Sequence, residues 1–258
     1  MNFYMVASSK QDSHSSKRNE PIGVANLVRD SWHLYLRHAR TFIGYSAWLL
    51  VPMAISVLLS LAFGSTDTMD IAQAVNGTLG LVIGTWLTIV FIKIIPLLRD
   101  KKRLRPRAIS KQAWKLFIPY LFLSVIINVL TGIGIVLFLI PGFIVIARLS
   151  YAQILIVRKK IDPLAAIKES VKLTKGKTWV LIRRLVGGIV MIGLPYALLS
   201  IFIAVAFASM RSLDLLTFFT QTQPTLLEIV SFQLLDILFI PIFLIYWVSM
   251  FRDIEQKA

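Results

Sequence analysis

The chain of 258 residues carries a formal net charge of +15, 57% hydrophobic residues and a mean hydropathy of +0.74. This composition is too apolar for an ordinary soluble domain, and the lack of cysteine excludes disulfides, thiolate nucleophiles and thiolate metal sites. A bilayer core about 30 Å thick requires roughly 20 apolar residues per helical span. We therefore expect an all-α polytopic membrane protein with about six transmembrane helices.

The first 20 residues are polar and serine-rich and lack the apolar core of a secretory signal. We predict a disordered cytosolic tail over residues 1–20 and a single membrane domain over residues 21–258. Apolar runs of sufficient length predict spans at residues 41–63, 74–98, 116–139, 140–157, 185–208 and 229–251.

The third and fourth predicted spans follow one another without a polar loop. Between Phe117 and Val157, a stretch of 41 residues, the only charged residue is Arg148. That length fits two spans joined by a tight turn. Glycine and proline favour the turn at residues 131–134 or at Pro141-Gly142.

Lysine and arginine are unevenly distributed among the polar segments. Residues 1–40 hold six, residues 99–115 hold eight, residues 158–177 hold seven, and two follow Phe251. The alternate connections are nearly free of them: residues 64–73 and the turn between the third and fourth spans hold none, and residues 209–225 hold only Arg211. Because cytoplasmic loops accumulate basic residues, both termini are predicted to be cytoplasmic, and an even number of spans fits this pattern.

The basic segment after the fourth span has the signals of a short interfacial helix over residues 162–175. Asp162 suits the N-cap, Pro163 the first helical position and Gly176 the position after the C-cap. A solvated basic loop is the alternative interpretation. The predicted apolar stripe consists of Leu164, Ile167 and Val171, and the candidate lipid-headgroup contacts are Lys168, Lys172 and Lys175.

Three segments that precede odd-numbered spans have related sequences. Arg29–Leu34 resembles Lys168–Leu173, and residues 113–116 are a weaker match. A repeated unit of one basic amphipathic helix and two spans would explain this relation. The alternative is that helices entering a membrane from the cytoplasm select similar residues independently.

Three ionisable residues fall within or near the predicted spans and are candidate intramembrane charges. Lys93 is close enough to the cytoplasmic end to reach the interface, which favours a structural role. Arg148 is expected deep in the membrane, facing the bundle interior, and Asp236 is the one acid in the predicted spans. We expect Arg148 either to pair with Asp236 or to face an anionic substrate.

A family resemblance rests on Ile140-Pro141-Gly142-Phe143, Arg148, Ser170, Lys175-Gly176 and Trp179. This pattern resembles the bacterial YciC-like family and the membrane domain associated with glycerophosphodiester phosphodiesterases. The likeness covers chiefly residues 135–185, and its motif residues include Pro141, Gly142, Ser170, Gly176 and Trp179. It implies a six-helix domain in a bacterial inner membrane and brings no catalytic residues with it.

No residues suggest catalysis, a metal site or a cofactor: the histidines are His14, His33 and His38, and motifs for zinc, phosphate or serine chemistry are missing. Topology explains the basic clusters, so no nucleic-acid partner is expected. We predict a non-enzymatic envelope protein that organises or handles anionic lipid or a partner membrane protein. The alternatives are a transporter or channel for a small anion and an accessory domain for a lipid-related enzyme.

Overall fold

The computed structural model describes residues 22–63, 66–212, 214–220 and 225–256, so the predicted tail over residues 1–20 lies outside the described residues. The described residues form helices and no strand. The helices are α2 (Val24–Arg37), α3 (Ala39–Ser46), η1 (Ala47–Leu49), α4 (Leu50–Phe63), α5 (Thr66–Arg99), α6 (Pro106–Leu137), α7 (Leu139–Lys159), α8 (Pro163–Thr174), α9 (Thr178–Gly188), η2 (Ile189–Gly193), α10 (Leu194–Met210), α11 (Leu215–Thr220) and α12 (Leu226–Glu255).

The chain is an all-α polytopic protein, as its composition predicts. Six helical stretches are long and apolar enough to cross a membrane. Each overlaps one of the predicted spans, and the main difference is that several helices continue into the polar segments. The six stretches are Ala39–Leu59, Ala74–Arg99, Pro106–Leu137, Ile140–Lys159, Thr178–Met210 and Leu226–Glu255.

The turn between α6 and α7 lies at Phe138, which has an extended backbone (φ −164°, ψ 145°). Both positions predicted for this turn are therefore wrong. The glycines on either side serve a different purpose, because a Cβ atom at Gly134 would lie 3.0 Å from the Cα atom of Gly142. The two glycines let the helices approach closely beside the turn instead of forming it.

A short π-helix, η2, interrupts the fifth long helical stretch between α9 and α10. The hydroxyl of Tyr246 in α12 donates a hydrogen bond of 2.5 Å to the carbonyl of Arg184 in α9. The ring of Tyr246 also occupies the space in which a side chain at Gly188 would lie. The irregular segment is thus held against α12 at a position where only glycine fits without a shift.

Helix α8 begins and ends as its sequence predicts. The carboxylate of Asp162 accepts a hydrogen bond of 3.0 Å from the amide of Leu164, Pro163 is the first helical residue, and Gly176 has a φ of +77°. Its small residues face the protein, while Leu164 is 60% exposed. The buried residues of α8 are Ala166, Ser170 and Thr174.

Most of the largest core comes from the last parts of three long helices, α5, α7 and α12. A short helical segment packs against each of them: α2 against α12, the beginning of α6 against α5, and α8 against α7. The three related sequences lie in these short segments, and the matched residues Ser31, Ala113 and Ser170 are all fully buried. This cyclic packing supports an internal repeat of three units.

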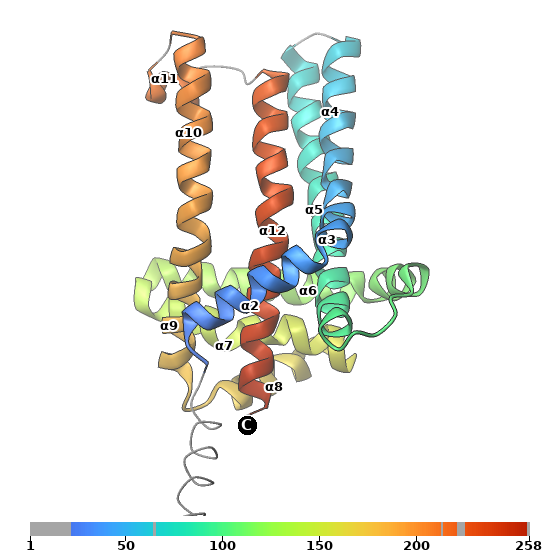
Figure 1. Ribbon diagram of the computed structural model, residues 1–258, viewed down its shortest axis with the longest axis vertical. Helices are drawn as coiled ribbons and strands as arrows, with labels where there is room; N and C mark the ends of the chain where they lie inside the picture. Colours follow the sequence, from blue (N-terminus) through green and yellow to red (C-terminus); the bar gives the residue numbers. More distant parts are fainter. Residues whose placement is uncertain (1–21, 64–65, 213, 221–224, 257–258) are drawn as a thin grey trace, which may run out of the picture.

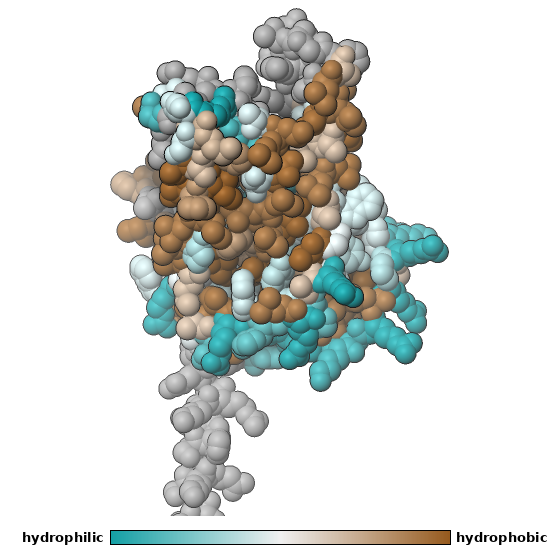
Figure 2. Space-filling model, turned by 45° about the horizontal axis from the view of Figure 1, so that its top comes forward, coloured by the Kyte–Doolittle hydropathy of each residue, from teal (hydrophilic) through white to brown (hydrophobic). Residues whose placement is uncertain are grey.

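The three units meet at one end of the molecule, which we call the basic end: α2, the first turns of α6, α8 and the last turns of α5, α7 and α12. Figure 2 shows hydrophilic residues gathered on the lower part of the visible face and hydrophobic residues above them. In Figure 1, α4, α10 and α12 run along the vertical direction, whereas α6 and α7 run across it.

Candidate anion site at the basic end

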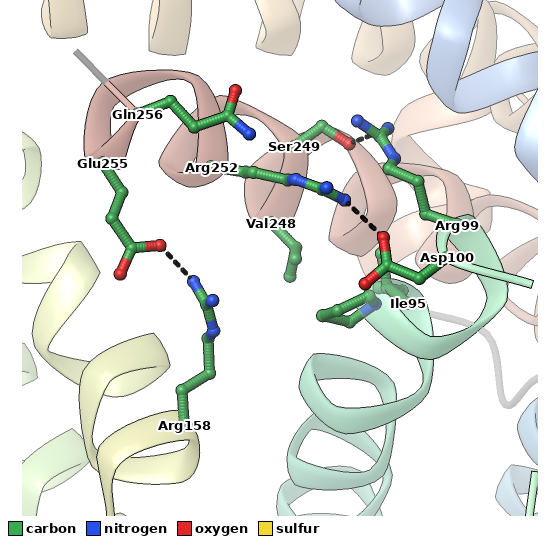
Figure 3. Close-up of a pocket in the computed structure, with 10 residues that line it drawn as sticks. Ile95, Arg99, Asp100, Arg158, Val248, Ser249, Arg252, Glu255 and Gln256 are labelled. Atoms are coloured by element: carbon green, nitrogen blue, oxygen red, sulfur yellow. Dashed lines mark hydrogen bonds and ion pairs between the residues drawn. The ribbon is translucent and has the colours of Figure 1, made fainter. Parts of the chain in front are cut away.

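The last turns of α5, α7 and α12 converge on a pocket of about 230 Å³, which we call the central pocket (Figure 3). Each helix contributes one arginine to it: Arg99 from α5, Arg158 from α7 and Arg252 from α12. The remaining lining residues are Ile95, Pro96, Asp100, Val248, Ser249, Glu255 and Gln256.

Two of the arginines form ion pairs that join neighbouring helices. Arg158 lies 2.5 Å from a carboxylate oxygen of Glu255, and its guanidinium stands 5.5 Å from the centre of the Phe251 ring. Arg252 lies 3.2 Å from a carboxylate oxygen of Asp100. These pairs connect α7 with α12 and α12 with α5, so the pocket is bounded by charged contacts on two sides (Figure 3).

Arg99 differs from the other two arginines, because no carboxylate of the described residues lies within 4.0 Å of its guanidinium. Its Nη2 donates a hydrogen bond of 2.7 Å to Ser249 Oγ, and that hydroxyl donates in turn to the Ile245 carbonyl at 2.6 Å. A guanidinium carries five N–H donors. Ser249 therefore orients Arg99 while leaving donors available to an anion.

A second pocket of about 240 Å³ is also lined by Arg99. It shares Arg99, Ser249, Arg252 and Gln256 with the central pocket. Its other lining residues are Ile22 before α2, Leu27 and Asp30 within α2, and Asp253 near the end of α12. Arg99 thus lines two open spaces at the basic end.

A buried ion pair between α9 and α12 lies next to this site in the chain. Nη2 of Arg184 in α9 lies 2.7 Å from a carboxylate oxygen of Asp253, and it also donates to the Ile22 carbonyl at 2.7 Å. These contacts fix the end of α12 against α9 and against the segment that leads into α2. Because Arg252 precedes Asp253 in α12, these contacts also fix the backbone position of Arg252.

The predicted headgroup lysines lie together on one surface of α8. Lys168, Lys172 and Lys175 line an open hollow of about 690 Å³ at the basic end. Glu169 lies in the same hollow and forms an ion pair with Lys159 of α7. The structure thus brings the three lysines to one exposed face, separate from the central pocket.

Arg148 is expected in the bundle interior, either paired with Asp236 or facing an anionic substrate; the interior placement and the pair with Asp236 are both wrong. Arg148 is exposed, and its Nε donates a hydrogen bond of 3.3 Å to Thr178 Oγ1. Asp236 instead accepts a hydrogen bond of 2.8 Å from the hydroxyl of Tyr196. The reason is the packing of α7 beside α8, where Ser170 Oγ donates to the Arg148 carbonyl at 2.5 Å. Arg148 therefore lies level with α8 and the start of α9.

The other predicted residues have local roles. Lys93 donates to Gln112 Oε1 at 3.1 Å, in the charged first part of α6, which agrees with a structural role at the interface. Pro141 and Gly142 lie in the first turn of α7, Ser170 is buried against it, and Trp179 is exposed in α9. The structure does not bring these motif residues together into one site.

Sequence reasoning missed the central pocket, although a signal for it exists. At or near their ends, the three even-numbered helical stretches carry Leu98-Arg99-Asp100, Val157-Arg158-Lys159 and Phe251-Arg252-Asp253. An apolar residue, an arginine and a second charged residue thus recur at equivalent positions of the three units. A three-unit repeat that includes these helix ends predicts that Arg99, Arg158 and Arg252 lie in one cluster.

The three arginines of the central pocket carry the charge and the N–H donors that binding of an anion would require. Among the described residues, no group of three or more His, Cys, Asp or Glu side chains is arranged to hold a metal ion. No protein-family model, no curated protein and no solved structure matches the chain.

Proposed function

We propose that this integral membrane protein binds the phosphate headgroups of anionic phospholipids at its basic end and organises or handles those lipids without catalysing a reaction. The observation that carries the proposal is Arg99, which Ser249 orients, which lines two pockets and which has no carboxylate within ion-pair distance among the described residues. Arginine is suited to this ligand, because its planar fork matches phosphate oxygens in pairs.

The charge balance of the central pocket supports the same ligand class. Its three arginines face two carboxylates, those of Asp100 and Glu255, which leaves one positive charge in excess. A phosphodiester headgroup carries one negative charge. The apolar side chains of Ile95 and Val248 line the same pocket and suit a ligand that carries hydrocarbon, such as a lipid, better than a hydrated inorganic ion.

We also propose that the basic end of the protein faces the cytoplasm. Basic residues are concentrated in the segments of the basic end, and such segments stay in the cytoplasm during membrane insertion. The basic end then faces the cytoplasm of a cell whose inner membrane holds the protein. There the exposed lysines of α8 meet an anionic leaflet, at about 1 kcal/mol of attraction per lysine.

Membership of the YciC-like group is a further part of the proposal, and it rests on the motif residues between Pro141 and Trp179. That likeness points to a membrane domain without a catalytic centre of its own. The transporter alternative loses its main support, because Arg148 is exposed beside α8.

The test compares Arg99→Gln with Arg103→Gln, a matched change at an exposed arginine that does not line the pocket. The purified protein is titrated with short-chain phosphatidylglycerol, short-chain phosphatidylcholine or inorganic phosphate, and the melting temperature is followed. We expect phosphatidylglycerol to raise the melting temperature of the wild type and of Arg103→Gln, and to have much less effect on Arg99→Gln.

Each contrary outcome rejects a defined part of the proposal. Equal stabilisation by phosphatidylglycerol and phosphatidylcholine would reject recognition of the anionic headgroup. A response to inorganic phosphate as large as that to phosphatidylglycerol would replace the lipid by a free anion. An undiminished response of Arg99→Gln would remove the central pocket as the site.

A further inference from the structure

The helix pair α6–α7 extends much less far beyond the core than the other two pairs. In α5, Thr66 is the first residue and Trp86 is the first core residue, so 20 residues precede the core. In α12 the corresponding residues are Leu226 and Ile242, a difference of 16, and in α7 they are Leu139 and Ala147, a difference of 8. At about 1.5 Å per residue, these lengths are roughly 30, 24 and 12 Å.

The partner helix α6 does not compensate for the short reach of α7. Gln153 of α7 donates a hydrogen bond of 3.0 Å to Ser124 of α6, and Gly134 touches Gly142, so the two helices run antiparallel from the core to the turn at Phe138. The last core residue of α6 is Ile127. The part beyond the core is therefore residues 128–146, which we call the hairpin tip.

Helix α8 fixes the level of α7 relative to the membrane surface. It folds back along α7, with an ion pair between Lys159 and Glu169 and a hydrogen bond of 2.5 Å from Ser170 Oγ to the Arg148 carbonyl. The opposite side of α8 exposes Lys168 and Lys172. Charged side chains do not enter hydrocarbon without partners, so α8 and the adjoining part of α7 from Arg148 to Lys159 lie at the level of the lipid headgroups.

The composition of the hairpin tip differs from that of the connections at the far ends of the other pairs. Residues 128–146 contain no charged residue, and Val136 and Phe138 are 87% and 75% exposed. By contrast, the α4–α5 connection carries Asp67 near its turn, and the segment after α10 carries Arg211 and Asp214. Those two connections suit water, whereas the exposed apolar tip suits hydrocarbon.

We infer that the hairpin tip inserts into the leaflet on the side of the basic end and does not cross the membrane. About 12 Å of helix above the headgroup level reaches at most the middle of a hydrocarbon core about 30 Å thick. The acyl chains of that leaflet cover Val136, Phe138 and Ile140, which are 87%, 75% and 63% exposed. In Figure 1, α6 and α7 run across the direction of α10 and α12, which agrees with this placement.

This inference leaves the all-α fold unchanged but reduces the membrane crossings from six to four. A hairpin that crosses the membrane twice and a hairpin that does not cross it both begin and end on the basic side. The distribution of lysine and arginine is therefore the same for both arrangements. The depth of Phe138 in the membrane distinguishes them. The inference does not depend on the central pocket or on its ligand.

Because the chain has no cysteine, single cysteines report directly on depth. We would place a nitroxide on Phe138→Cys, and on Ser212→Cys and Ser110→Cys as matched controls near the far end and at the basic end. The proteins are reconstituted in vesicles of phosphatidylcholine and phosphatidylglycerol, and collision with oxygen is compared with collision with a water-soluble nickel chelate. We expect the nitroxide at Phe138 to collide with oxygen and to be shielded from nickel, at a depth between the bilayer centre and the basic side.

A second measurement uses a membrane-impermeant maleimide added to the side that labels Ser212→Cys. We expect it to leave Phe138→Cys unmodified while Ser212→Cys reacts. Reaction of Phe138→Cys from that side, or a nitroxide depth within the leaflet of the far side, would overturn the inference. Because the side chain of Phe138 is exposed, the substitution is compatible with folding, and the intact melting temperature of the variant is the check.

Discussion

Arg184 in α9 and Asp253 near the end of α12 form an ion pair of 2.7 Å in which the two side chains are only 3% and 5% exposed. The same guanidinium holds the carbonyl of Ile22, so one residue joins the segment before α2 to two helices from the last third of the chain. A charge buried this deeply depends on its partner, since it has little water to replace the lost contact.

We expect Asp253→Leu and Arg184→Leu each to lower the free energy of unfolding by about 3 to 5 kcal/mol, because each removes one partner of a buried ion pair. The double replacement should recover a substantial part of the loss. Chemical or thermal unfolding in detergent measures all three variants. The control is Asp100→Leu, whose pair with Arg252 is more than one-third exposed and should contribute at most about 1 kcal/mol. Equal losses at Asp100 and Asp253 would contradict this assignment.

Gly188→Ala should destabilise the protein by about 1 to 3 kcal/mol, because the new methyl group overlaps the Tyr246 ring. Gly84→Ala is the matched control, since no atom lies within 4 Å of its added Cβ and alanine favours a helix over glycine by roughly 0.5 to 1 kcal/mol. Melting temperatures should therefore move in opposite directions. If both variants are stabilised, the contact between Gly188 and Tyr246 does not restrict the position.

Arg148 and Asp236 should behave as independent sites. They have separate partners, Thr178 and Tyr196, and form no ion pair with each other. The losses of unfolding free energy for Arg148→Leu and Asp236→Leu should add within about 0.5 kcal/mol in the double variant. A double variant that loses clearly less unfolding free energy than the two single variants together would show that Arg148 and Asp236 do form a pair.

Replacing the N-cap of α8 should loosen this helix selectively. Asp162→Ala removes the carboxylate that accepts from the Leu164 amide and should cost about 1 kcal/mol, whereas Asp162→Asn keeps an acceptor and should cost little. Hydrogen exchange of the α8 amides measures the effect directly. Unchanged protection in Asp162→Ala would mean that the packing of Ala166, Ser170 and Thr174 against α7 alone holds the helix.

The sequence predicts the helical stretches and the ends of α8 well, because apolar runs and caps are local signals. It fails for Arg148 because counting residues from the membrane surface assumes that a helix crosses the bilayer directly. Helix α7 instead lies beside α8 for half of its length. The predicted positions of the α6–α7 turn are wrong because glycine occurs both in turns and at close contacts between helices. Gly134 and Gly142 lie at such a contact.

The central pocket was beyond sequence reasoning for a different reason. Arg99, Arg158 and Arg252 come from three helix ends separated by 59 and 94 positions, and each is an ordinary basic residue at a membrane boundary when taken alone. Only the packing of α5, α7 and α12 brings them together. The uneven lengths of the three units obscure their relation along the chain.

The contact between α2 and α12 gives the fold a definite order of completion during synthesis. Helix α2 leaves the ribosome before the other helices that the structure describes, yet its buried residues Leu27 and Tyr35 belong to a core that includes the end of α12. The beginning of α6 and helix α8 each pack on a long helix that precedes them in the chain, so those contacts form as soon as these segments are made. Helix α2 must wait for α12. A nascent chain therefore exposes one apolar surface until translation is nearly finished, and a stop codon before the last turns of α12 leaves that surface uncovered for quality-control proteases.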